Sequence, residues 1–194
     1  MAATSIKKIV VLGPESTGKS TLCTQLAAHY GTLWCPEYAR EYLLQHGIRY
    51  SFADLLTIAK GQIQLEEQYL QQVQHSSGTT QLLFIDTDMY VMKVWCEFVF
   101  GKCHQWILDQ IARRRYDLYL LCRPDLPWVK DELREYPDTA TRVRLYHYYK
   151  DLLVQQSTPW AEVYGSYDER LQRALEAVER YIPGFQPAAA TPYR

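Results

Sequence analysis

The sequence has almost no net charge, no long apolar run and no paired cysteines, and each absence excludes a class of protein. Its formal net charge of −1 provides no overall field that would recruit nucleic acid or an anionic membrane. No apolar run approaches the ~18 residues that a membrane span needs. Residues 1–5 lead directly into an apolar run, so we expect no signal peptide and nothing fused upstream. We therefore expect a cytoplasmic protein that binds neither nucleic acid nor membrane.

Cysteine and histidine are too scattered to build a metal site or a disulfide framework. The five cysteines are odd in number and form no C-x-x-C pair, which favours a reducing compartment. None of the five histidines stands at ligand spacing from a cysteine or another histidine. No G-x-G-x-x-G follows a strand, and neither G-x-S-x-G nor Asn/Thr-Lys-x-Asp occurs. These absences argue against a dinucleotide fingerprint, a hydrolase nucleophile elbow and base recognition of the GTPase kind.

What the sequence does contain is G-x-x-x-x-G-K-S at residues 13–20, between a predicted strand and a predicted helix. Glycines let such a loop curl with its N–H groups inward, and the helix N-terminus adds partial positive charge. Lys19 would reach the β- and γ-phosphates, and the Ser20 hydroxyl would ligate Mg²⁺. The sequence therefore predicts a binding loop for Mg·ATP, with contacts from Gly13, Glu15, Ser16, Thr17, Gly18, Lys19, Ser20 and Thr21.

Apolar strands alternate with amphipathic helices along the chain, which predicts an α/β fold with a five-stranded, mostly parallel sheet and helices on both faces. The predicted strands are 7–12, 32–35, 81–86, 117–122 and 161–164. The predicted helices are 19–30, 37–45, 52–74, 90–100, 104–114, 140–155 and 167–181. We expect one domain over residues 1–182 and a flexible tail over 183–194. Ligands should bind beyond the carboxyl ends of the strands.

Two acidic residues, Asp86 and Asp88, close the third predicted strand. An aspartate at this place is typical of a Walker-B site, where it holds the metal opposite Ser20. The alternative is a helix N-cap, because Asp is a good cap and a helix follows. We expect at least one of the two to be functional, with Asp86 a metal ligand and catalytic residue and Asp88 a substrate contact. Which of them faces the metal and which the substrate stays open.

Glu37 and Arg40 follow the second predicted strand, one helical turn apart, so that both can face one cleft. A carboxylate there can accept the proton of an attacking hydroxyl or hold a sugar diol. The alternative is an acid that interacts with the helix dipole beside a solvent-facing arginine.

Residues 123–139 form a long predicted loop after the fourth strand, rich in proline and charge. Loops of this length are usually functional, and a lid that closes over ATP would supply an arginine to the γ-phosphate. Arg134 and Arg123 are the strongest candidates, and Trp128 is a substrate-binding candidate. Ser166 follows the fifth strand at the same edge and is a nucleotide-binding candidate.

Four motifs together resemble the ribosylnicotinamide kinase domain of the bacterial NadR proteins, a nucleoside-kinase-like branch of the P-loop NTPases. They are Gly-Pro-Glu-Ser-Thr-Gly-Lys-Ser-Thr-Leu (13–22), Glu-Tyr-Ala-Arg-Glu (37–41), Phe-Ile-Asp-Thr-Asp (84–88) and Trp-Val-Lys-Asp-Glu-Leu-Arg (128–134). Weaker matches are Ala-Lys-Gly-Gln (59–62) and Gly-Ser-Tyr-Asp-Glu-Arg (165–170). The resemblance covers residues 7–182.

The resemblance implies that Mg·ATP phosphorylates the ribose 5′-hydroxyl of nicotinamide riboside in NAD salvage. It makes Glu37, Asp86 and Asp88 candidates for base, metal and ribose contacts, and Arg134 a lid arginine. Tyr38 or Trp34 could stack the pyridinium ring. Two positions depart from the family pattern: Glu132 replaces a glycine in the lid motif, and Pro36 stands where some members have tryptophan. Full NadR proteins carry further domains, so adenylyl transfer and repression are not expected here.

Two other functions are compatible with the same sequence. One is a kinase for another nucleoside or small metabolite, which only a substrate panel would separate. The other is a regulatory module that binds ATP and switches a partner, whose ATPase activity would ignore a nucleoside. The oligomeric state stays open, a homo-oligomer included.

Overall fold

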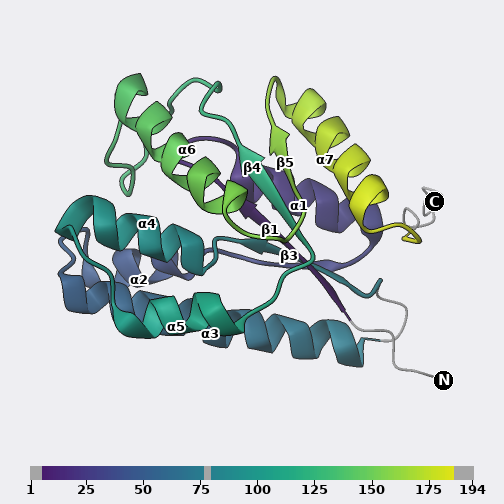
Figure 1. Ribbon diagram of the computed structural model, residues 1–194, viewed down its shortest axis with the longest axis horizontal. Helices are drawn as coiled ribbons and strands as arrows, with labels where there is room; N and C mark the ends of the chain where they lie inside the picture. The colour runs from purple at the N-terminus through teal and green to yellow at the C-terminus, as the bar shows by residue number, and fades with distance from the viewer. Residues whose placement is uncertain (1–5, 77–79, 186–194) are drawn as a thin grey trace.

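The computed structural model describes residues 6–76 and 80–185. Five parallel strands form one sheet in the order β2-β3-β1-β4-β5 (Figure 1). The strands are β1 (Lys7–Leu12), β2 (Leu33–Cys35), β3 (Leu82–Asp86), β4 (Leu118–Cys122) and β5 (Trp160–Val163). The helices are α1 (Lys19–Tyr30), α2 (Tyr38–His46), α3 (Phe52–His75), α4 (Met89–Phe100), α5 (Gln105–Arg113), α6 (Thr139–Val154) and α7 (Tyr167–Tyr181).

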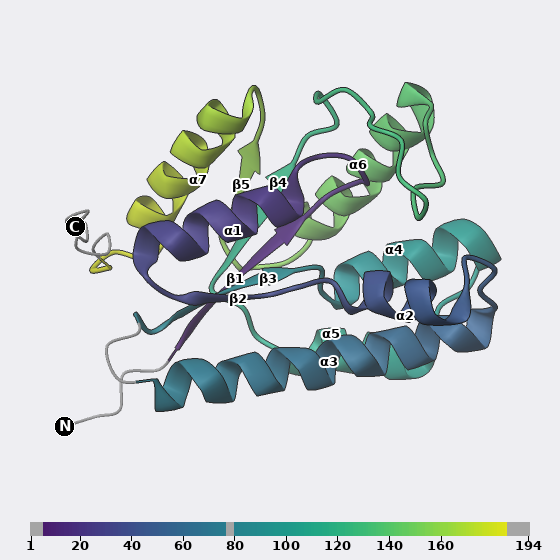
Figure 2. The same cartoon turned by 180° about the vertical axis from the view of Figure 1, so that it is seen from behind.

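Helices cover both faces of the sheet because the central strands are apolar on both sides. Alternate residues of β1 enter two different cores: Ile9 and Val11 on one face, Val10 and Leu12 on the other. Helices α1 and α7 lie together over the first face, as seen from behind in Figure 2. Helices α3, α4 and α6 supply residues to the second core. This two-sided burial is what a parallel sheet requires.

A third core lies among the helices themselves and joins α2, α3, α4 and α5. Helix α3 begins at a reciprocal capping box between Ser51 and Asp54. Its inner face carries Leu55, Ile58 and Ala59, all fully buried. The packing of α2 against α3 thereby fixes the position of residues 36–37, which connect β2 to α2.

The predicted fold class is confirmed, since the sheet has five strands, all of them parallel, between helical layers. Predicted and observed bounds of the strands and helices differ by one residue at most. Residues 123–138, between β4 and α6, contain no helix or strand and are called the lid segment below. In the predicted tail, Phe185 packs against the first core, and residues 186–194 lie outside the described residues.

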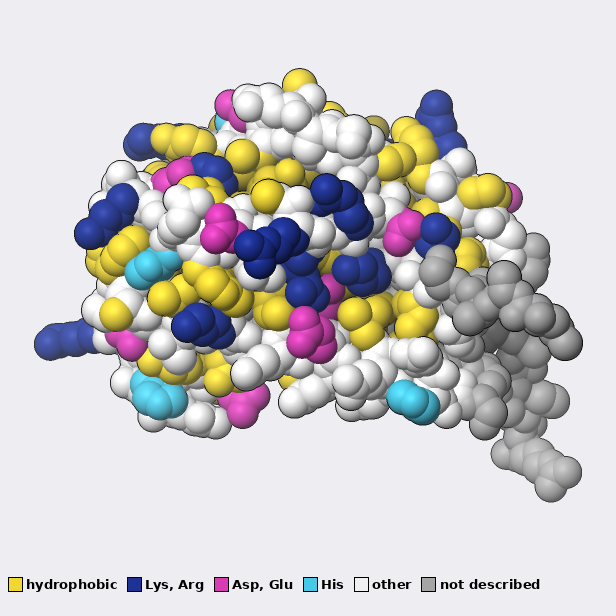
Figure 3. All heavy atoms as spheres, turned by 60° about the horizontal axis from the view of Figure 1, so that its bottom comes forward, with side chains coloured by type: hydrophobic (Ala, Val, Ile, Leu, Met, Phe, Trp, Pro, Cys, Tyr) yellow, Lys and Arg dark blue, Asp and Glu magenta, His cyan; other side chains and the backbone are white. Residues whose placement is uncertain are grey.

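Basic and acidic side chains are interspersed over the face shown in Figure 3, in keeping with the small net charge. Among the described residues, no helix is long and apolar enough to cross a membrane.

Candidate active site

The loop between β1 and α1 has the backbone of a phosphate cradle. Ser16 and Gly18 adopt positive φ angles of 56° and 77°, which turns successive N–H groups toward one centre. No side chain caps α1 at Gly18, so the N–H groups of its first turn are available to an anion. Lys19 Nζ lies on the loop and donates to the Pro14 carbonyl at 2.9 Å. Gly13 has no room for a side chain, since a Cβ there would lie 2.6 Å from the Cys122 carbonyl oxygen.

Ser20 and Asp86 form a donor set that fits Mg²⁺. The Ser20 hydroxyl donates to Asp86 Oδ2 at 2.5 Å. Asp86 is fully buried, and its Oδ1 has no hydrogen-bond partner among the described residues. Burial raises the pKa of Asp86, while the nearby Lys19 ammonium and the Ser20 hydroxyl oppose that rise. A buried carboxylate oxygen without a partner beside a serine hydroxyl is the oxygen environment that a hard divalent cation prefers.

A cavity of about 620 Å³ opens beside the phosphate loop, a size suited to a small-molecule site. Residues 13–21, with Asp86 and Tyr167, supply a largely polar part of its lining. Another part is mostly apolar and aromatic, with Pro36, Glu37, Ala39, Arg40, Leu43, Val91, Val94, Trp95, Phe98, Leu145 and Tyr149. Trp34 lines the cavity too, but it packs against the first core, with α1 and α7. Lid residues Val129, Asp131, Leu133, Arg134, Glu135 and Tyr136 line it as well.

Glu37 lies in this cavity because α3 fixes the turn that carries it. Gln62, almost fully buried, accepts from the Tyr38 N–H at 2.7 Å and donates to the Pro36 carbonyl at 3.2 Å. The Tyr38 ring lies on Gly61, where a Cβ would come within 2.1 Å of a ring carbon. Glu37 occupies the N-cap position of α2 without making a cap hydrogen bond, so its carboxylate is available to a ligand. The weakly matching motif at 59–62 therefore positions Glu37.

The electrostatic surroundings of Glu37 suit a proton acceptor. Burial raises its pKa to about 7, with a further contribution from the Asp86 carboxylate, while Lys19 and Arg40 act in the opposite direction. A general base works best when its pKa lies near the working pH.

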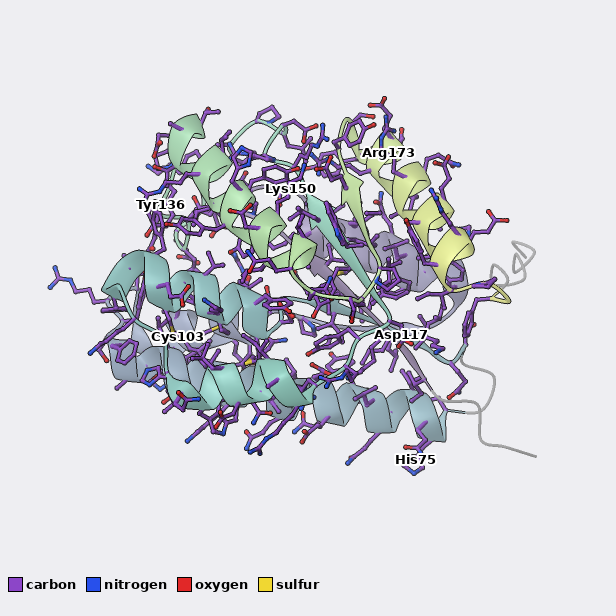
Figure 4. All side chains as sticks on the ribbon, viewed as in Figure 1. His75, Cys103, Asp117, Tyr136, Lys150 and Arg173 are labelled. Carbon is purple, nitrogen blue, oxygen red and sulfur yellow. The ribbon has the colours of Figure 1, made fainter. Side chains whose placement is uncertain are left out.

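Arg40 and Arg134 bring positive charge to the cavity from two sides. Arg40, on α2, pairs with Asp131 of the lid segment through two hydrogen bonds of 3.2 and 3.0 Å. Arg134 lies in the lid segment and donates to the Val129 carbonyl. Figure 4 shows the next part of this segment, with Tyr136 near the ends of α4 and α6. Its ring meets Phe98 of α4 edge to face, with ring centroids 5.4 Å apart.

Asp88 does not line the cavity, so the expectation of a substrate contact is corrected. Its carboxylate caps α4, accepting from the N–H groups of Tyr90 at 3.0 Å and Val91 at 3.4 Å. It also accepts from the Tyr119 hydroxyl at 3.2 Å. Asp88 is therefore the N-cap of α4, whereas Asp86 is buried beside Ser20 with one carboxylate oxygen unpartnered among the described residues.

Four further predicted contacts lie outside the cavity for reasons of packing. Tyr38 turns toward Gly61, as described, so Trp34 is the predicted stacking residue that lines the cavity. Trp128 donates from its indole to Glu15. Arg123 pairs with Glu162 and covers the ring of Tyr164. Ser166 caps α7 in a capping box with Glu169.

Two groups of residues were not predicted from the sequence: the apolar lining residues of the cavity, and Arg170, which supports the backbone of the phosphate loop. Trp95, Phe98 and Tyr149 come from helices that carried no motif, so nothing in the sequence singled them out. Arg170 is almost fully buried and donates to the Thr17 carbonyl at 3.0 Å and the Arg123 carbonyl at 3.1 Å. Arg170 lies in the weakly matching motif at 165–170, and this match was the one feature of the sequence that could have pointed to it.

Comparison with known proteins agrees with the motif resemblance. The chain is 29% identical over 185 residues to the trifunctional NAD biosynthesis/regulator protein NadR of Salmonella typhimurium, covering 91% of this chain and 43% of that protein. The chain thus spans less than half the length of this curated relative. Two solved structures of a NadR protein share the fold. One, in complex with NR, has a TM-score of 0.77 at 23% identity and covers 95% of this chain and 52% of that one.

The other structure, in complex with NAD and AMP-PNP, has a TM-score of 0.71 at 22% identity and covers 96% of this chain and 52% of that one. At these identities the likeness concerns the fold. A protein-family model, AAA_28, described as an AAA domain, matches residues 8–170. Because this match spans most of the sequence, the chain belongs to the AAA_28 family of AAA domains.

Proposed function

We propose that this protein transfers the γ-phosphoryl group of Mg·ATP to the ribose 5′-hydroxyl of nicotinamide riboside, giving nicotinamide mononucleotide. The observation that carries the proposal is one cavity whose lining combines a phosphate cradle, the buried carboxylate of Asp86, the carboxylate of Glu37 and several aromatic side chains. The ligands of the two solved NadR structures, NR in one and NAD with AMP-PNP in the other, support it. The phosphate cradle, the two carboxylates and the aromatic side chains are together the components that a small-molecule kinase needs.

The polar part of the cavity lining suits ATP, the phosphoryl donor. The N–H groups of the loop and of the first turn of α1 would hold the triphosphate, and Lys19 would leave the Pro14 carbonyl to contact the β- and γ-phosphates. Mg²⁺, held by Ser20 and Asp86, would neutralise charge that develops on the transferred group. Arg134 would add a second cation from the lid side, where such a residue stabilises the transition state.

The apolar and aromatic part of the cavity lining suits the nucleoside, which is the phosphoryl acceptor. A pyridinium ring is flat and cationic, so aromatic faces such as those of Trp95 and Phe98 on α4 would bind it favourably. Trp34 is a second candidate, from the side of the first core. Glu37 lines the same cavity and interacts electrostatically with Lys19 of the phosphate loop and with Asp86. It would accept the proton of the 5′-hydroxyl as that oxygen attacks phosphorus, and its raised pKa suits this step.

We also propose that the reaction takes place in the cytoplasm, since none of the five cysteines is in a disulfide and all are compatible with a reducing environment.

Two measurements separate this function from the alternatives. ADP release from Mg·ATP should be slow in the protein alone and strongly stimulated by nicotinamide riboside, and Lys19→Ala should abolish the stimulation. A thermal-shift panel of nucleosides with Mg·ADP identifies the acceptor, because a ligand at 100 times its dissociation constant adds about 2.7 kcal/mol of stability. Stimulation by another nucleoside only would point to a different kinase. ATPase activity that ignores every nucleoside would point to a regulatory module.

A further inference from the structure

Glu15 lies within the phosphate loop, yet its carboxylate is bonded to the lid segment. Its Oε1 accepts from the Trp128 indole N–H at 3.0 Å and from the Tyr136 N–H at 2.7 Å. Its Oε2 accepts from the Glu135 N–H at 2.9 Å. These contacts join residues more than 110 positions apart in the chain. One side chain of the phosphate loop thus holds both ends of the part of the lid that contains Arg134.

The sign of the charge argues against a role for Glu15 in binding phosphate. A carboxylate in a loop that receives a triphosphate repels it, because like charges at short range cost free energy. The loop therefore gains nothing from an acid at this position unless the acid binds something else. Hydrogen bonds to an ionised acceptor are among the stronger ones in proteins, and three of them converge here.

A neighbouring contact reinforces the same junction. Ser16 Oγ accepts from the Val129 N–H at 3.0 Å, which places a second loop residue against the lid. On the outer side, Arg40 pairs with Asp131, as described. Arg134 lies between these attachment points and next to Glu135, whose N–H binds Glu15.

We propose that Glu15 is a positioning residue that fastens the lid segment to the phosphate loop and thereby holds Arg134 over the site of phosphoryl transfer. This inference rests on the proposed kinase function for its kinetic consequence. The fastening itself is a property of the free protein and can be measured without any substrate.

Hydrogen–deuterium exchange of the free protein tests the fastening directly. The amides of Glu135 and Tyr136 should be protected in the wild type and should lose protection about tenfold or more in Glu15→Ala, the range expected for hydrogen bonds to a charged acceptor. Glu15→Gln, which keeps an acceptor oxygen, should retain part of the protection. Glu176→Gln, at an exposed carboxylate of α7 that also accepts a side-chain hydrogen bond, is the matched control and should change nothing. Equal protection in the wild type and Glu15→Ala would overturn the proposal.

A second variant keeps the test decisive if Glu15→Ala does not fold. Trp128→Phe removes only the indole donor and keeps an aromatic ring, so it should lower the protection of the same two amides by a smaller factor. Unchanged protection in Trp128→Phe together with unchanged protection in Glu15→Gln would count against the fastening.

Steady-state kinetics of Glu15→Ala separate a positioning role of Glu15 from a general structural role. With nicotinamide riboside as acceptor, Glu15→Ala should lower kcat about tenfold or more, because Arg134 is released. Its KM for ATP should not rise, since a repulsive carboxylate has been removed from the triphosphate site. A rise in KM at unchanged kcat would contradict the proposal. If no nucleoside is phosphorylated by the wild type, the proposed function fails, while the exchange experiment still decides the role of Glu15.

Discussion

Glu37 illustrates at the scale of one residue how burial can prepare a side chain for chemistry. Its pKa of about 7 results first from burial and then from Asp86 and Glu15, against the opposing charges of Lys19 and Arg40. A base must be deprotonated to accept the hydroxyl proton, so a raised pKa makes it inactive on the acidic side. We therefore expect kcat/KM to fall as the pH drops through about 7 and to level off above it.

The pH–rate profile measured between pH 5 and 9 checks this, with Glu37→Gln as the comparison. That variant should have a low rate without the acidic limb. A wild-type profile that stays flat down to pH 5 would show that Glu37 is not the base.

Asp86 gives a second prediction at the residue scale, because function and stability should move in opposite directions. Asp86→Asn removes the proposed anionic ligand of Mg²⁺ and should lower Mg²⁺-dependent turnover about 100-fold or more. The same change removes a buried carboxylate that has an unpaired oxygen, so chemical denaturation at pH 7 should show equal or greater stability. The matched control is Asp109→Asn, at a half-buried α5 carboxylate that accepts from Gln105. A joint loss of stability and activity in Asp86→Asn would mean that the residue is structural.

The element scale shows why some predicted contacts lie in the cavity and others do not. The order of strands and helices follows from apolar periodicity. A parallel sheet brings the carboxyl ends of β1, β2 and β3 to one edge. For this reason Lys19, Glu37 and Asp86 could be placed together from the sequence. Which way a side chain turns depends on its packing partner. The Tyr38 ring lies on Gly61 of α3, a partner that is distant in sequence and that no motif of known role marks. Asp88 caps α4, the helix that directly follows it, so here the sequence offered both readings and only the packing decides between them.

Gly61 gives a prediction about how two helices position the site. Gly61→Ala places a methyl group where the Tyr38 ring lies, so α2 must shift from α3 and carry Glu37 with it. Overpacking of this kind costs about 1–3 kcal/mol, and kcat should fall with it. The double variant with Tyr38→Ala should recover much of the stability, because the clash is removed. Additive losses in a denaturation double-mutant cycle would refute this packing argument.

Asp88 gives the corresponding prediction for α4, which carries the wall residues Val91, Trp95 and Phe98 of the cavity. Asp88→Ala should lower the free energy of unfolding by about 1–3 kcal/mol, since it removes an N-cap and leaves the buried Tyr119 hydroxyl without this acceptor. Asp88→Asn keeps the cap and should stay close to the wild type in stability. Equal losses in both variants, measured by chemical denaturation, would argue against the capping role.

At the scale of the whole molecule, the cavity lies between two parts that the sequence order does not reveal as neighbours. The phosphate loop joins β1 of the sheet to α1, whereas most apolar and aromatic lining residues come from the helices α2, α4 and α6. The lid segment connects the two through Glu15, Ser16 and Arg40. This arrangement can hold a nucleotide at one end and a flat nucleoside at the other, with the transferred group between them.

The most direct test of this account is the identity of the product formed from Mg·ATP and nicotinamide riboside, observed by ³¹P NMR and mass spectrometry. We expect ADP and an equal amount of nicotinamide mononucleotide phosphorylated at the 5′-hydroxyl, with no product from Lys19→Ala. ATP hydrolysis to ADP and inorganic phosphate with the nucleoside unchanged, in a folded and nucleotide-binding preparation, would contradict it.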